Sequence, residues 1–322
     1  MKAMLLFVVS SLPVGFGLAA EPEYKGKPFS HWLSQLQNKD PNIRSEAAQV
    51  LGGLGPEAAK IAIPDLIELL RDSHGKVRGA AASALGSMGA DAKPAVPALI
   101  QLLGDKEADV RVAAATAFRD LGSVAKGAAP ALMELLADRE GEVREAAATA
   151  FGRMGREARM AIPALIELLG DKEADVRVAS ALALRDLGPE AKLAIFDLTR
   201  LLQDKEGKVR EAAASSLGRM GPEAKTSIPA LTELLRDTNG NVRGAAASAL
   251  AGMGPEARRT AVTTLMELLR DQERDVRLNA IEALAATGPD AKSAVPALTR
   301  ALQDTDERVR KAAADALEKI GK

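Results

Sequence analysis

Two histidines and two rows of charged residues are the groups in this chain whose types and spacing could do chemistry. His31 and His74 stand far apart, and neither belongs to a His-Glu-x-x-His motif, the pattern that places two zinc ligands on one helix face. The absence of cysteine excludes a disulfide scaffold, a cysteine-ligated metal and a cysteine nucleophile. We therefore predict no metal, no cofactor and no enzymatic activity, with His31 on the surface of the first helix and His74 in a turn.

The charged rows consist of Arg and Asp residues that recur along the chain. An Arg follows a β-branched residue at nine places, spaced 33 or 34 residues apart. An Asp stands six residues before this Arg in every unit except the first, where Asn38 replaces it. A charge pair present in every unit suits the maintenance of a stack better than a single active site, because an Arg and a carboxylate form a strong bidentate contact.

The fixed period predicts a solenoid, in which each unit buries its apolar face by stacking on its neighbours. In the unit 155–188, Ile162, Leu165 and Leu168 fall three and four residues apart and indicate a first helix, called A. A second helix, called B, begins near Asp175 and ends at Gly188. We expect a glycine to end helix B in the left-handed conformation in every unit. These glycines are Gly55, Gly89, Gly122, Gly155, Gly188, Gly221, Gly254, Gly288 and Gly321.

The composition agrees with such a stack. The chain contains 63 Ala, whose small side chains allow neighbouring helices to approach closely. Hydrophobic residues make up 47% and charged residues 27% of the chain, which excludes both a disordered chain and a bundle of membrane spans. The net charge of −1 provides no general attraction to nucleic acid or to an anionic membrane.

The motifs of one unit resemble a known family. Gly-Pro-Glu-Ala-Lys, Ile-Pro-Ala-Leu, Leu-Leu-x-Asp, Val-Arg and Ala-Ala-x-x-Ala-Leu-Gly follow one another in register, and over residues 28–322 the chain is similar to HEAT repeats of the phycobilisome-lyase-like subgroup. The resemblance implies that helix B lines the concave side and that the Asp and Arg form a hydrogen-bonded ladder along the stack. The ladder residues are Asp72, Arg78, Asp105, Arg111, Asp138, Arg144, Asp171, Arg177, Asp204, Arg210, Asp237, Arg243, Asp271, Arg277, Asp304 and Arg310.

We therefore predict an all-α fold, an α-solenoid that forms a right-handed superhelix of about nine two-helix HEAT-like repeats. It covers residues 21–322, with an N-terminal cap repeat at about 28–55 and eight further repeats over 56–322. Proline occupies one position of helix A in most units, and we expect a straighter helix where Ser30, Phe196 or Thr263 replaces it. Trp32 aligns with a buried Leu position and is assigned to the cap, with ligand anchoring at the groove mouth as the alternative.

Residues 1–20 have the order of a secretory signal peptide. A basic start at Lys2 precedes an apolar run, and small residues at Ala19 and Ala20 come before Glu21. We predict cleavage after one of these alanines and export to the periplasm or the outside of the cell. An uncleaved membrane anchor is the alternative, although the run is short for a span.

The outward positions of helix B vary while its buried positions repeat, which is typical of a recognition surface on a fixed scaffold. In the central units they include four candidate partner-binding arginines, Arg119, Arg153, Arg185 and Arg219. Two interpretations fit: the arginines bind partner carboxylates, or neighbouring acidic residues neutralise them in a solvated lattice. Sequence identities 66 residues apart also allow the row to be a by-product of repeat duplication.

The predicted function is a non-enzymatic scaffold that binds a protein or peptide along the concave helix B surface. The first alternative is an enzyme or enzyme accessory of the bilin-lyase-like HEAT group. The second is a nucleic-acid-binding HEAT-like protein, which the near-neutral charge and the few aromatic residues disfavour. We expect no nucleic-acid partner, and membrane contact only if the signal segment is retained.

Overall fold

The computed structural model describes residues 22–54 and 56–321. The predicted signal peptide at 1–20 lies outside these residues. Within them the chain forms one short hairpin and a series of helices that group into nine A and B pairs. The elements are β1 (Glu23–Tyr24), β2 (Lys27–Pro28), α1 (Phe29–Gln35), α2 (Pro41–Gly52), α3 (Pro56–Leu69), α4 (Gly75–Ser87), η1 (Gly89–Ala95), α5 (Val96–Leu102), α6 (Ala108–Leu121), η2 (Gly122–Ala128), α7 (Ala129–Leu135), α8 (Gly141–Arg153), η3 (Gly155–Ala161), α9 (Ile162–Leu168), α10 (Ala174–Leu187), η4 (Gly188–Ala194), α11 (Ile195–Leu201), α12 (Gly207–Met220), η5 (Gly221–Ser227), α13 (Ile228–Leu234), α14 (Gly240–Gly252), α15 (Pro255–Leu268), α16 (Arg274–Thr287), η6 (Gly288–Ala294), α17 (Val295–Ala301) and α18 (Glu307–Gly321).

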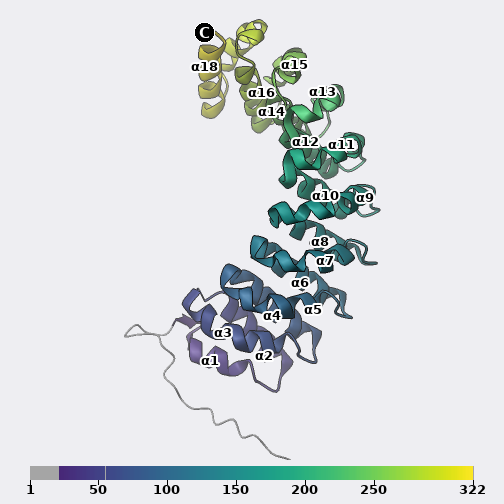
Figure 1. Cartoon of the computed structure of the whole chain (residues 1–322). Coiled ribbons are helices and arrows are strands. Elements are labelled where there is room, and N and C mark those ends of the chain that lie inside the picture. The colour runs from purple at the N-terminus through teal and green to yellow at the C-terminus, as the bar shows by residue number, and fades with distance from the viewer. Residues whose placement is uncertain (1–21, 55, 322) are drawn as a thin grey trace, which may run out of the picture.

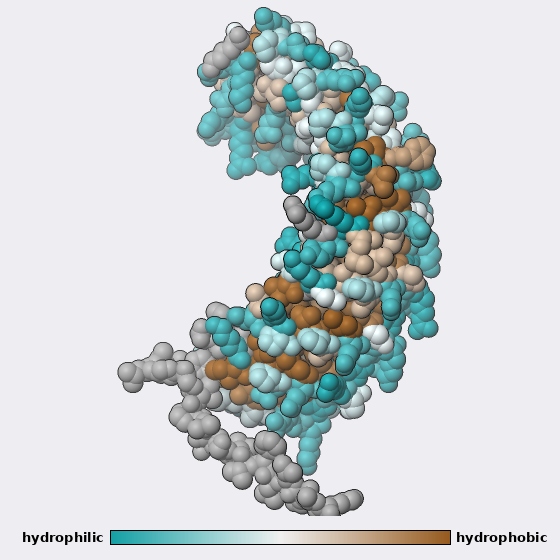
Figure 2. Space-filling view, viewed as in Figure 1, coloured by the Kyte–Doolittle hydropathy of each residue, from teal (hydrophilic) through white to brown (hydrophobic). Residues whose placement is uncertain are grey.

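The helix pairs stack into a curved arc (Figure 1). The B helices, which carry even numbers from α2 to α18, pack against one another along the inner side, and the A helices form the outer side. Hydrophilic residues follow much of the outline of the arc, and apolar residues lie in patches on the visible face (Figure 2). This arrangement is an all-α solenoid with helix B on the concave surface, as predicted.

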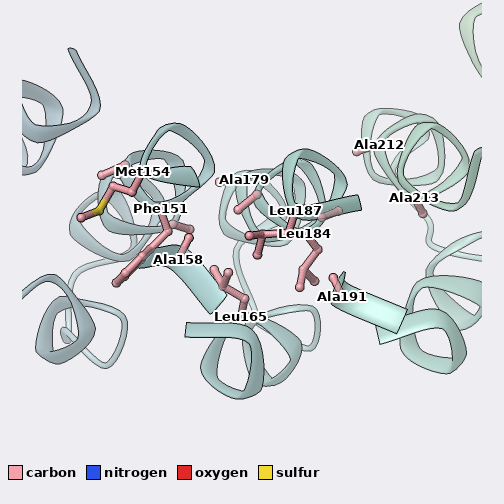
Figure 3. Packing of buried hydrophobic residues seen from close by; sticks show 14 of the residues in the cluster. Phe151, Met154, Ala158, Leu165, Ala179, Leu184, Leu187, Ala191, Ala212 and Ala213 are labelled. Atoms are coloured by element: carbon pink, nitrogen blue, oxygen red, sulfur yellow. The ribbon is translucent and has the colours of Figure 1, made fainter. Parts of the chain in front are cut away.

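The core lies between the two layers of helices and between successive repeats. Val176, Leu184 and Leu187 of α10 are buried, as their spacing predicts, and Leu165 of α9 reaches the same layer. Phe151 of α8 is fully buried and packs in the layer before them (Figure 3). Because each repeat contributes only part of every layer, a single repeat leaves its apolar face uncovered.

Glycine follows most of the B helices with the predicted positive φ. Gly122, Gly188 and Gly221 directly follow α6, α10 and α12 with φ of 55°, 57° and 67°. Their ψ values of −129°, −135° and −140° differ from those of a left-handed helical residue, and this φ and ψ combination also requires glycine. Gly89, Gly155, Gly254 and Gly288 also have positive φ. The last position differs from the prediction, because Gly321 belongs to α18 and does not have a positive φ. Gly55 lies outside the described residues.

Proline does not decide whether helix A is straight, contrary to our prediction. In six units helix A consists of a 3₁₀ segment of seven residues followed by a short α-helix. The unit with Phe196 has this break although it lacks the proline. Helix α15, with Thr263 at this position, is continuous as predicted, but α3 is continuous as well although it contains Pro64.

The number of residues explains the difference. Helices α3 and α15 belong to the two units in which the spacing of the Arg row is 34 rather than 33 residues. A 3₁₀-helix rises about 2.0 Å per residue and an α-helix about 1.5 Å. A unit that is one residue shorter therefore reaches the same height by forming part of helix A as a 3₁₀-helix.

The N-terminal repeat is capped by a hairpin that the sequence analysis did not anticipate. Strands β1 and β2 are joined by Lys25 and Gly26, which have φ of 50° and 67°, the left-handed values of a two-residue hairpin turn. Trp32 is only 7% exposed, and its Nε1 donates to the carbonyl of Tyr24 at 3.3 Å. This burial assigns Trp32 to the core of the cap.

Candidate partner-binding surface

The ladder arginines before Arg310 each connect two neighbouring repeats. Arg144 of α8 donates from Nε to Oδ2 of Asp171 at 2.7 Å and from Nη2 to Oδ1 at 2.9 Å. Its Nη1 donates to the backbone carbonyl of Asp138, in its own repeat, at 2.7 Å. The same arrangement joins Arg44 to Asp72, Arg78 to Asp105, Arg111 to Asp138, Arg177 to Asp204, Arg210 to Asp237 and Arg243 to Asp271. Arg277 also pairs with Asp304, but only its Nη2 donates a hydrogen bond to that carboxylate, at 2.9 Å. Every rung therefore ties one inter-helix turn to the next.

The two ends differ from the predicted set of ladder residues. Arg44 was not among them, yet it forms the first rung with Asp72. Arg310 was among them, but within the described residues it bonds to the carbonyls of Asp304 and Thr305 and to no carboxylate. Asn38 occupies the first Asp position, where no earlier repeat supplies an arginine. A neutral amide fits there because an unpaired, partly buried carboxylate would be costly.

The ladder keeps its carboxylates ionised. Burial alone would raise the pKa of the Asp171 carboxyl, but the hydrogen bonds from Arg144 and from the amide of Glu173, with the charge of Arg144, hold this pKa below its ordinary value of 3.8. The side chains of Asp171 and Arg144 are 8% and 9% exposed. The pKa is lowered in the same way at Asp72, Asp105, Asp138, Asp204, Asp237, Asp271 and Asp304.

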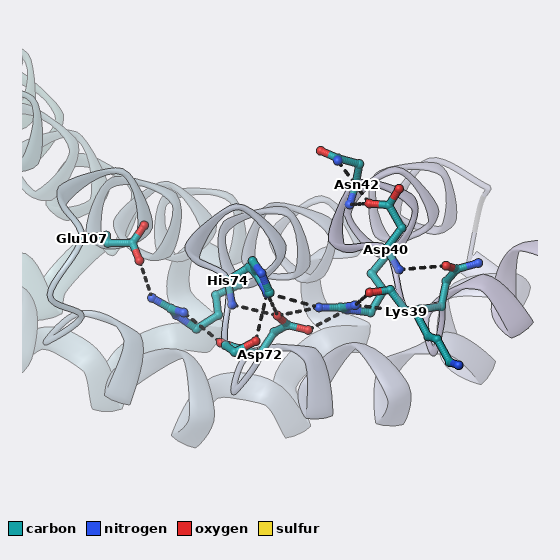
Figure 4. Close-up of polar contacts among 10 residues, drawn as sticks. Lys39, Asp40, Asn42, Asp72, His74 and Glu107 are labelled. Atoms are coloured by element: carbon teal, nitrogen blue, oxygen red, sulfur yellow. Dashed lines mark hydrogen bonds and ion pairs between the residues drawn. The ribbon is translucent and has the colours of Figure 1, made fainter.

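The two histidines lie at separate places near the N-terminal end. His74 precedes α4 beside the first rung, with Nδ1 3.3 Å from Oδ1 of Asp72 (Figure 4). His31 of α1 contacts the edge of the Trp32 ring. In the described part of the chain, no group of three or more His, Cys, Asp or Glu side chains is placed to hold a metal ion. None of the described helices is both long and apolar enough to cross a membrane.

Three of the four candidate arginines meet at one hollow on the concave surface. Arg119, Arg153 and Arg185, at the C-terminal ends of α6, α8 and α10, line a space of about 520 Å³. Thr149 and Leu182 also line it. Arg219, at the same end of α12, lies outside this hollow.

The four arginines fall into two kinds. Arg119 donates to Asp120 at 2.9 Å, and Arg185 donates to Asp186 at 3.0 Å, so these two charges are neutralised by their own neighbours. Arg153 and Arg219 are exposed. Neither has a hydrogen-bond or ion-pair partner among the residues that the structure describes. The solvated-lattice interpretation thus fits the first two arginines and not the second two.

One of the positions assigned to the recognition surface is partly a packing position. The residue nine after the Val of helix B is Arg at Arg119 and Arg185, but it is Gly in α2, α4, α8 and α12. A Cβ on Gly86 or Gly218 would lie 2.7 Å from the Cα of an Ala in the next B helix. Sequence reasoning missed this requirement, although the alternation of Gly and Arg was a visible signal.

Acidic residues occupy the other edge of the concave surface, at the N-terminal halves of the B helices. The acidic edge consists of Asp109, Glu142, Glu145, Asp175 and Glu211. Burial raises the pKa of Glu145, and the nearby charges of Asp175 and Glu142 raise it further. Lys208 pairs with Asp175 across neighbouring repeats.

The basic edge consists of Arg119, Arg153, Arg185 and Arg219, at the opposite ends of the same helices. Partly buried Val112 and Val178 occupy in α6 and α10 the position that Glu145 and Glu211 occupy in α8 and α12, and partly buried Leu182 lies nearer the middle of α10. The groove of the central repeats is therefore polarised across its width. This polarity also follows the helix dipoles, which favour acidic residues at N-termini and basic residues at C-termini.

Comparison with known proteins accounts for the repeats. The family model described as HEAT repeats matches residues 29–119, 63–150, 129–197, 195–285 and 262–322. The chain belongs to the HEAT-repeat family. Among solved structures, this HEAT-repeat chain is similar to a crystal structure of an engineered protein, a target of the Northeast Structural Genomics Consortium, with 23% identity and a TM-score of 0.49 over 91% of this chain and 99% of that one. No curated protein sequence matches it.

Proposed function

We propose that this HEAT-repeat protein is a non-enzymatic scaffold that binds a protein or peptide segment in the groove between the acidic and basic edges. The observation that carries the proposal is Arg153, an exposed cation that lines a hollow on the concave side and whose side chain has no partner among the described residues. In α4 and α14, the B helices that flank the central group α6 to α12, the positions equivalent to Arg153 are Ser87 and Gly252. Charge is thus concentrated in the central repeats and absent from equivalent positions beside them.

A polypeptide suits this groove better than the alternative partners. A nucleic acid carries negative charge along its whole backbone, and the acidic edge would repel it, although Lys208 neutralises Asp175 there. A polypeptide can present both signs of charge and an apolar side chain to Val178 or Leu182. We assign the repeats to the phycobilisome-lyase-like subgroup on their motifs, and a bilin-lyase accessory role would require a chromophore to copurify with the protein.

We further propose that the protein acts after export. The signal-peptide order of residues 1–20 supports this. Mass spectrometry of the protein isolated from its native cell would give the mature N-terminus, which we expect at Ala20 or Glu21. An N-terminus at Met1 in a membrane fraction would instead indicate a retained anchor.

Site-directed crosslinking tests the groove, because the chain has no native cysteine. Thr149→Cys places a single thiol on the wall of the hollow, and Glu167→Cys places one on exposed α9 at the convex side. Each variant is labelled with a photoactivatable crosslinker and added to the exported fraction of the native cell. We expect a discrete adduct only with Thr149→Cys, reduced when Arg153→Glu is added. Equal adducts at both positions would contradict binding in the groove.

A further inference from the structure

The concave charges of the central repeats follow a period of two repeats. Helix α6 ends with the ion pair of Arg119 and Asp120, and α10 ends with the equivalent pair of Arg185 and Asp186. In the helices between and after them, α8 and α12, the same two positions are instead Gly followed by Arg. Self-neutralised pairs thus alternate with Arg153 and Arg219, whose side chains pair with no residue in 22–54 or 56–321.

The close approach of neighbouring helices favours the glycine of this alternation. Asp186 Oδ2 lies 3.3 Å from the place where a Cβ on Gly152 would be. The ion pair of α10 therefore lies close to the C-terminal end of α8, next to Arg153. Gly218 of α12 likewise approaches the backbone of Ala249 in α14. Glycine at this position leaves the following Arg as the only charged side chain at the basic edge of its helix.

We propose that the groove holds an extended polypeptide whose acidic side chains are six residues apart, one at Arg153 and one at Arg219. This inference rests on the proposed groove function and specifies its ligand. Helices α8 and α12 are separated by one B helix (Figure 1). With interaxial distances of 8 to 10 Å, the two arginines stand about 16 to 20 Å apart along the stack. An extended chain rises about 3.3 Å per residue and covers this distance in five or six residues.

The acidic edge favours a spacing of six residues, and not five, between the two acidic side chains of the ligand. Successive side chains of an extended chain point to opposite sides, so two acidic residues face the same edge only when their spacing is even. The residues between them at odd offsets then face Glu145 and Glu211, which occupy the opposite edge of the same two helices. Basic side chains at those offsets complement that edge. The ligand is therefore a segment with acidic residues on one side and basic residues on the other.

Synthetic peptides with a Gly and Ser background test this register by fluorescence anisotropy with the full chain at low salt. The series carries Asp at positions i and i+6, i and i+5, i and i+11, or at i alone, each with Lys directly after each Asp. We expect the i+6 peptide to bind about fivefold more tightly than the others. Arg153→Gln and Arg219→Gln should each reduce its affinity to that of the single-Asp peptide, while Arg200→Gln, on exposed α11, should leave it unchanged.

The outcomes separate this inference from the function on which it rests. A maximum at i+11, the spacing that suits an α-helix, would overturn the extended conformation. Equal affinities at all spacings, unaffected by Arg153→Gln, would overturn the register. If no acidic peptide binds while Thr149→Cys still captures a partner, the acidic ligand is wrong and groove binding stands. If neither occurs, both proposals fail. Unchanged thermal melting of the variants confirms that they are folded.

Discussion

The ladder and the basic edge are two rows of arginine on the same B helices, and they differ in what each guanidinium can reach. Ladder side chains are 8 to 15% exposed and bond to an Asp of the next repeat. On the basic edge, Arg119 is 43% exposed and bonds to its own neighbour, and Arg153 bonds to no described residue. A charged residue that recurs in the repeats therefore stabilises the stack only where its side chain bonds to the neighbouring repeat.

Acidification should affect the ladder far more than the basic edge. Low pH protonates every ladder carboxylate and leaves all the arginines charged. The folded state holds the pKa of these Asp residues below 3.8. Their contribution to stability is therefore complete above pH about 4 and is lost as the pH falls through the lowered pKa values. We expect melting temperatures that stay level from pH 7 to about pH 4.5 and then drop steeply. A steady decline between pH 7 and 5 would contradict this mechanism.

Removing one ladder carboxylate gives the next largest effect. Asp171→Ala leaves the guanidinium of Arg144 buried without its partner, which should lower the free energy of unfolding by about 3 to 5 kcal/mol. Urea denaturation measures it. The matched control is Asp175→Ala, whose side chain is 64% exposed and pairs with Lys208, and it should cost less than about 1 kcal/mol. Similar losses in both variants would refute the distinction between the ladder and the exposed ion pairs.

At the basic edge, the glycines that contact the next B helix should contribute to stability through packing and not through charge. Gly218→Ala places a Cβ 2.7 Å from the Cα of Ala249. Overpacking should destabilise the protein by about 1 to 3 kcal/mol, even though Ala favours helix by roughly 1 kcal/mol. Gly127→Ala, with no atom within 4 Å of its Cβ, is the control and should have little effect. If Gly218→Ala melts at or above the parent temperature, the alternation of Gly and Arg has another cause.

The smallest expected effect concerns the acidic edge. The raised pKa of Glu145 means that its ionised form is disfavoured by folding, so stability increases as the pH falls through this pKa toward 4.5. Glu145→Gln should accordingly stabilise the protein slightly at pH 7, by less than about 1 kcal/mol, whereas exposed Glu233→Gln should leave it unchanged. Calorimetry of the two variants provides the comparison. A destabilised Glu145→Gln would show that this carboxylate makes a favourable contact.

The stack was predictable from sequence because its pattern is repeated nine times. The buried stripe of α10 and the glycine after it, Gly188, follow from spacing and from the conformational freedom of glycine alone. The form of helix A could not be predicted from Pro64 or Phe196, because it depends on one additional residue in the unit and not on the residue at this position. That effect depends on matching the height of neighbouring repeats, which is a property of the packed array.

The surface was predictable only in part. Sequence position placed Arg119, Arg153 and Arg185 on one face, and the structure brings them to one hollow. Sequence did not distinguish Arg153 from the other two, because pairing with Asp120 or Asp186 depends on side-chain geometry. The closeness of Gly218 to the next helix was equally hidden. Local patterns indicate which face a residue occupies, and only the packed helices decide what it can touch there.

The polarity of the ladder bears on how molecules meet one another. Arginine always points toward the following repeat and aspartate toward the preceding one, a head-to-tail contact that in other circumstances builds open filaments. Among the described residues Arg310 bonds only to its own turn, and Asn38 stands at the Asp position of the first repeat. A second copy of this chain stacked on the first repeat would therefore offer Arg310 an amide instead of a carboxylate, and the contact would lack the ion pair that joins repeats within the chain.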